Sequence, residues 1–133
     1  MLSPRQNMDN ALKKYLVPAL RERGFKGSYP HFRRLLQDRV DLLTIQFDKN
    51  GGGFVVEISR CGVEGIATHW GKHVPAAKVT AWDLRADKRL RLKLKEGAGT
   101  DAWFRFESGE YRQVAEQILS RLVDADNYWA GRV

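Results

Sequence analysis

The sequence contains few of the residues that mark a disulfide framework or a membrane span. Cys61 is the single cysteine among 133 residues, so an intrachain disulfide is excluded. No apolar run approaches the roughly 18 residues that a membrane-spanning helix needs. The first ten residues, MLSPRQNMDN, lack the apolar segment of a signal peptide. We therefore expect a cytoplasmic protein that is not attached to a membrane.

Acidic residues are outnumbered, with 16 Asp or Glu against 23 Lys or Arg and a formal net charge of +7. The excess is uneven, because residues 78–95 hold 7 basic and 2 acidic side chains while residues 96–133 hold 4 and 7. Such an asymmetry allows attraction to a polyanion or to an acidic protein. The length and the 43% hydrophobic content predict a single domain over residues 1–133.

A predicted hairpin between Val40 and Ser59 organises the rest of the chain. Both arms alternate with a period of two, which is typical of half-buried antiparallel strands. One face carries Leu43, Ile45 and Phe47 on the first arm and Phe54, Val56 and Ile58 on the second. Asn50 and the three glycines that follow it suit the turn, because they tolerate a positive φ.

Two amphipathic helices are predicted at the ends of the chain. The first begins at Ser3, with Pro4 at its first position and a capping box to Gln6, and we expect a kink or a break at Pro18. The last is capped by Ser108 and ends near Tyr128 or Trp129. Its apolar stripe consists of Tyr111, Val114, Ala115, Ile118, Leu119, Leu122 and Val123.

Further short strands complete the predicted sheet. Residues 31–36, in an undecided register, join 40–48 and 54–60 in a meander, and strands follow near 89–95 and 102–107. Residues 61–83 show neither period, so we expect an irregular segment there. The resulting class is α+β: a two-layer domain with an antiparallel sheet of about five strands and both helices packed on one face.

The order of these motifs resembles one known family. The segments LRERGFKG, HFRRL, LLTIQFDK and FVVEIS are followed by LRADKRLRL and DAWFRFES, and together they run from about Asn10 to Ser108. This pattern is similar to the bacterial family named domain of unknown function 4304. The resemblance implies a small cytoplasmic α+β domain, and it brings no activity, cofactor or catalytic residue with it.

The irregular segment contains the residues for two kinds of reactive site. His69 and His73 could share a helical face as metal ligands, with Cys61 or Glu64 as a third ligand, but Gly71 between them disfavours a helix. Cys61 with either histidine could form a nucleophile and base pair. Neither arrangement has the spacing of a metal or catalytic motif, so ordinary loop histidines and a partly buried cysteine are favoured. We expect no metal and no cofactor.

The strongest functional signal is a basic strand face. Arg89, Arg91, Lys93 and Lys95 alternate with leucines, Arg85 precedes them, and Trp82 and Trp103 are expected nearby. Cations beside exposed aromatic rings can hold single-stranded nucleic acid. The simpler interpretation is a solvated face, because a sheet with helices on one side only needs a polar opposite face and basic residues discourage edge pairing.

Three functional hypotheses follow. The leading one is a non-enzymatic binding or interaction module that uses the basic face or the 61–83 segment to hold an acidic protein or a polyanion. The second is a sequence-tolerant binder of single-stranded nucleic acid. The third is a small enzyme with its site in the 61–83 segment. The exposed edge of the sheet leaves both a monomer and a homodimer open.

Overall fold

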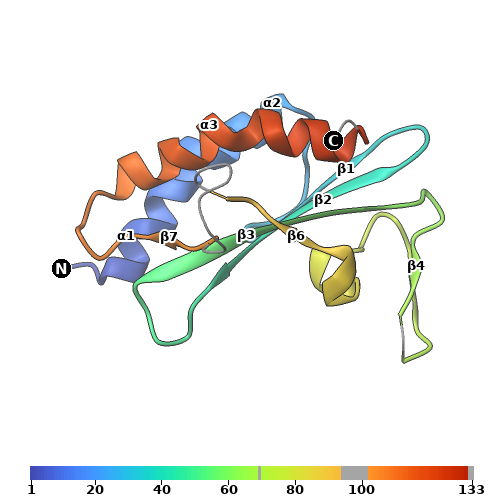
Figure 1. Ribbon diagram of the computed structural model, residues 1–133, viewed down its shortest axis with the longest axis horizontal. Helices are drawn as coiled ribbons and strands as arrows, with labels where there is room; N and C mark the ends of the chain where they lie inside the picture. Colours follow the sequence, from blue (N-terminus) through green and yellow to red (C-terminus); the bar gives the residue numbers. More distant parts are fainter. Residues whose placement is uncertain (69, 94–101, 132–133) are drawn as a thin grey trace.

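A computed structural model describes residues 1–68, 70–93 and 102–131, and it has an antiparallel sheet with the helices packed on one face (Figure 1). The strands are β1 (His31–Leu35), β2 (Val40–Phe47), β3 (Gly53–Cys61), β6 (Leu90–Arg91) and β7 (Phe104–Arg105). The helices are α1 (Pro4–Ala11), η1 (Leu12–Leu16), α2 (Val17–Glu22) and α3 (Tyr111–Trp129). The predicted α+β class with about five strands is confirmed.

The N-terminal helix begins as the sequence predicts. Ser3 Oγ accepts a hydrogen bond from the Gln6 amide at 3.1 Å, and Gln6 Oε1 accepts one from the Ser3 amide at 2.8 Å. Pro18 does not break the helix, because a π-helical turn precedes it, and the Val17 amide bonds to the carbonyl of Leu12. The chain therefore stays helical through the proline and absorbs the missing donor in one widened turn.

The first three strands form the predicted meander, with β2 between β1 and β3. Phe32 pairs with Leu43 and is 1% exposed, which settles the undecided register of the first strand in favour of Phe32 facing the helices. The far edge of β3 pairs with both β6 and β7. The strand expected over 89–95 is only two residues long within the described chain, and Leu94 and Lys95 lie outside the described residues.

Helix α3 covers the sheet with a stripe that differs in part from the expected one. Val114, Ala115, Ile118 and Leu122 are buried as predicted, and the stripe continues through Ala125 and Trp129. Val123 is 58% exposed, so its predicted place in the core is wrong. The predicted cap at Ser108 is also wrong, because the helix begins at Tyr111 after a left-handed Gly109 with φ of 79°.

The face of the sheet opposite the helices, here called the open face, is covered over part of its area by the irregular segment. This segment contains the small hairpin β4 (Ile66–Ala67) and β5 (His73–Val74) and the 3₁₀ turn η2 (Ala81–Asp83), and a second 3₁₀ turn, η3 (Ala86–Lys88), follows it. A second apolar cluster joins Val40 and Leu42 of the sheet to Val74, Val79 and Ala81. The expectation of a wholly polar opposite face is therefore wrong.

In the described part of the chain, no helix has both the length and the apolar character that crossing a membrane requires.

Candidate functional site

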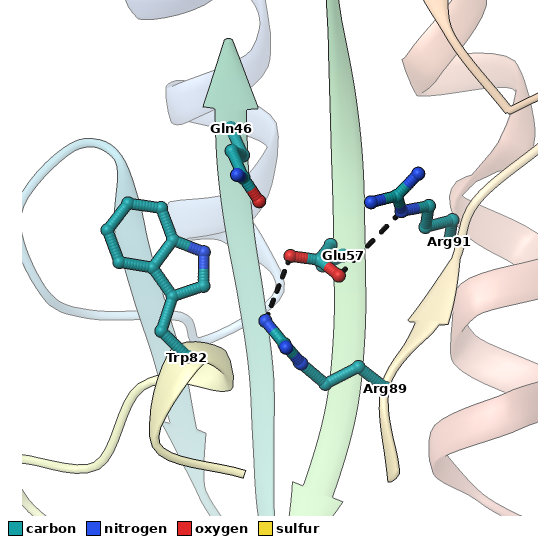
Figure 2. Close-up of a pocket in the computed structure, with 5 residues that line it drawn as sticks. All are labelled: Gln46, Glu57, Trp82, Arg89 and Arg91. Carbon is teal, nitrogen blue, oxygen red and sulfur yellow. Dashed lines mark hydrogen bonds and ion pairs between the residues drawn. The ribbon is translucent and has the colours of Figure 1, made fainter. Parts of the chain in front are cut away.

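The uncovered part of the open face contains a hollow of about 310 Å³, here called the sheet hollow (Figure 2). Figure 2 shows Trp82 on one side, Arg89 and Arg91 on the other, and Glu57 between the arginines. The lining residues are Gln46 from β2, Glu57 from β3, Trp82 from η2, Arg89 and Arg91.

Strand register places the polar lining on one face. Glu57 is opposite Thr44 on β2 and opposite Arg91 on β6, so all three side chains share the open face. Gln46 follows Thr44 by two residues and therefore points the same way. The neighbouring positions, Ile45 and Ile58, face the helices and belong to the main core. The alternation that builds the core thus also builds the hollow.

Trp82 is held at the rim by local contacts. The Thr80 amide donates to Asp83 Oδ2 at 2.8 Å, which fixes the 3₁₀ turn that carries the tryptophan. The ring of His31 meets the Trp82 ring edge-on at 4.7 Å, and His31 Nδ1 lies 3.0 Å from Thr44 Oγ1. Burial, and secondarily the charge of Arg33, lowers the pKa of His31, so the imidazole is neutral at pH 7. These contacts fix the position of Trp82, and the residue is still 46% exposed.

Glu57 is the electrostatic centre of the hollow. It is 5% exposed, and a carboxylate so deeply buried needs ionic partners. Arg89 Nη1 lies 3.2 Å from Glu57 Oε1, and Arg91 Nε lies 3.8 Å from Glu57 Oε2. The buried Nε of Arg89 makes no hydrogen bond within the described part of the chain. Two arginines thus share one carboxylate, which leaves one net positive charge, and several of their N–H groups make no hydrogen bond to the described residues.

The structure brings some of the candidate residues together and separates others. Arg89, Arg91 and Trp82 line the hollow, and the Arg91 guanidinium lies 5.7 Å from the centroid of the half-buried Trp103. Of the other candidates, Arg85 and Lys93 do not line it. Arg85 is exposed beside Asp87 at 3.6 Å, Lys93 is exposed, and Lys95 lies outside the described residues.

Two lining residues, Gln46 and Glu57, were not among the sequence candidates. The alternation of the hairpin already placed both on the face opposite the helices. A charged residue within the apolar run FVVEIS was the signal that a partner must lie across from it. The sequence did not show which strand supplies that partner.

Of the residues proposed for a reactive site, the structure describes Cys61, Glu64 and His73. Burial, with smaller contributions from Glu64 and Asp41, raises the pKa of the Cys61 thiol to about 11. His73 Nε2 lies 2.9 Å from the carbonyl oxygen of Glu64 and is exposed, and His69 is outside the described residues. Among the described residues no group of three or more His, Cys, Asp or Glu side chains is placed to hold a metal ion.

Alkylation tests the state of the thiol. A pKa of about 11 leaves about two orders of magnitude less thiolate at pH 8 than the ordinary value does, so Cys61 should react slowly with iodoacetamide. The rate should keep rising up to about pH 11 in the folded protein, and the same protein in urea should show an ordinary cysteine profile. A folded-state inflection near pH 7 would instead indicate an activated nucleophile.

The comparisons with known proteins identify a family and no function. No curated protein and no solved structure matches the chain. One family model, described as "Domain of unknown function (DUF4304)", matches residues 16–132, which is most of the chain. The protein therefore belongs to the DUF4304 family.

Proposed function

We propose that this protein is a non-enzymatic binding module of the cytoplasm and that the sheet hollow holds an anionic group of its partner. The proposal depends on one observation, which is that two arginines, Arg89 and Arg91, line the same side of the hollow. Their shared carboxylate, Glu57, fixes their position, and the Nη groups that have no partner among the described residues can bind a ligand. Guanidinium groups held in this way match carboxylate or phosphate oxygens.

The charge of the sequence segment that contains both arginines supports the same proposal. Residues 78–95 carry 7 basic and 2 acidic side chains, and Arg89 and Arg91 belong to this stretch. A basic stretch of this kind attracts an anion electrostatically, and dissolved salt screens this attraction and shortens its range. Binding at the hollow is therefore expected to weaken as the ionic strength rises.

A matched pair of arginine variants tests the proposal. The wild-type protein should bind fluorescently labelled polyphosphate and polyglutamate at low salt, as followed by anisotropy. Arg91→Gln, which removes a guanidinium from the hollow, should weaken the binding of at least one of them several-fold. Arg85→Gln removes the same charge from an exposed position outside the hollow and should have a much smaller effect.

Equal losses from the two substitutions would mean that net charge alone governs binding. Failure of the wild-type protein to bind either polyanion at low salt would also contradict the proposal. Circular dichroism of both variants checks that the fold is retained.

A further inference from the structure

We propose that the partner is a single-stranded nucleic acid and that the sheet hollow accepts one of its bases against Trp82. This inference rests on the proposed function and specifies the chemistry of the ligand. A single strand is favoured because a base in a duplex is already stacked and paired and must lose both interactions before it can enter a pocket in the protein.

Trp82 supplies a stacking surface. The residue is 46% exposed at the rim of the hollow, and the edge-on contact of the His31 ring at 4.7 Å fixes the Trp82 ring without covering both of its faces. A ring whose orientation is already set loses little entropy when a flat group stacks on it. The hollow of about 310 Å³ is at the lower end of the range for small-ligand sites, which suits a single heterocyclic base.

The polar groups of the hollow distinguish a base from an acidic side chain. Glu57 at the floor is a carboxylate and offers only acceptors, so the carboxylate of an acidic peptide finds no donor on it and can bind only to the arginines. A nucleobase brings N–H donors that Glu57 can accept. Gln46 offers both a donor and an acceptor at the same wall, which matches the mixed edge of a base. These two residues favour nucleic acid over an acidic protein.

The arginines are placed for the backbone that carries such a base. The Arg91 side chain is 47% exposed, and its contact with Glu57 is made by Nε rather than by its two Nη groups. The nearby ring of Trp103 supports the guanidinium from the side, at 5.7 Å. A phosphate of the nucleotide whose base lies in the hollow can therefore contact a positioned guanidinium. The other basic residues add an attraction that does not depend on sequence.

Two labelled oligonucleotides test the inference in fluorescence anisotropy titrations. One is a single strand of about ten nucleotides, within the usual range of site sizes. The other has the same length and charge but contains only abasic sites. The wild-type protein should bind the first at least about fivefold more tightly, because only the first can stack. Trp82→Ala should abolish this difference, while Trp70→Ala, at an exposed tryptophan outside the hollow, should preserve it.

The outcomes separate the two proposals. Equal affinity of the wild-type protein for both oligonucleotides would overturn base insertion and leave anion binding standing. Binding of polyglutamate without binding of either oligonucleotide would identify an acidic protein as the partner and overturn this inference alone. Absence of binding to every polyanion at low salt would overturn the proposed function as well. If Trp70→Ala instead reduced the preference for the oligonucleotide that has bases, the stacking site would lie outside the hollow.

Discussion

Replacing Asp41 with alanine is expected to lower the free energy of unfolding by about 3–5 kcal/mol. Asp41 is 0% exposed and accepts hydrogen bonds from Arg34 Nη2 at 2.7 Å and from Arg39 Nε at 2.8 Å. The alanine variant keeps both guanidinium groups, whose side chains are only 15% and 19% exposed, without the carboxylate that compensates them. The loss thus comes mainly from buried charge that has lost its nearest partner, since Arg34 keeps only the longer contact to Asp126 at 3.7 Å.

Urea denaturation followed by circular dichroism at pH 7 measures this loss. Glu116→Ala is the matched control, because it removes a carboxylate from an ion pair with Arg112 in which the side chains are 50% and 67% exposed. The control should change the free energy of unfolding by less than about 1 kcal/mol. Similar values for the two variants would show that the Asp41 site is solvated in solution and that its ion pairs contribute little.

Local periodicity was sufficient to predict the sheet and the helices. A spacing of two predicted the hairpin of β2 and β3 and its core residues, which are Leu43, Ile45, Phe54, Val56 and Ile58. Spacings of three and four residues predicted the C-terminal helix. Each of these patterns repeats several times within a few residues. The predictions failed at single positions, which were the cap at Ser108 and the burial of Val123. At each of them a shift of less than one helical turn decides whether a residue caps the helix or faces the core.

The partners of charged residues could not be predicted in the same way, because they come from distant parts of the chain. Alternation put Glu57 on the open face, but its ionic partners, Arg91 in the short strand β6 and Arg89 just before it, are more than thirty residues away. The burial of Val40 and Leu42 depends likewise on Val74, Val79 and Ala81 in a segment without any period. Sequence reasoning could name Arg89 and Arg91 as candidates, but only the register of β3 and β6 joins them to Glu57.

Replacing Trp129 with alanine is the second change with a large expected effect, a loss of about 3–5 kcal/mol in the free energy of unfolding. Trp129 is 0% exposed near the end of α3, and its ring lies 4.9 Å from that of Phe25. Its Nε1 donates to the carbonyl oxygen of Ser59 at 3.0 Å, which joins the helix to β3. The substitution therefore opens a large cavity and leaves a buried acceptor without its donor.

Two further variants define the origin of that loss in urea denaturation. Trp129→Phe keeps most of the ring and removes the donor, so it should cost about 1–3 kcal/mol. Val123→Ala shortens a side chain on the same helix that is 58% exposed, and it should change stability by no more than about 0.5 kcal/mol. A Trp129→Ala variant as stable as Val123→Ala would mean that the end of α3 is not packed on the sheet in solution.

Trp129 and Asp41 should not act independently, because Arg34 contacts both. The Arg34 guanidinium lies 5.3 Å from the centroid of the Trp129 ring while it bonds to Asp41. Removal of either neighbour frees the arginine to move toward solvent, so the second removal costs less than it does alone. The double variant should therefore lose less stability than the two single losses together, by about 0.5–3 kcal/mol. Additive losses would show that Arg34 does not couple α3 to the hairpin of β1 and β2.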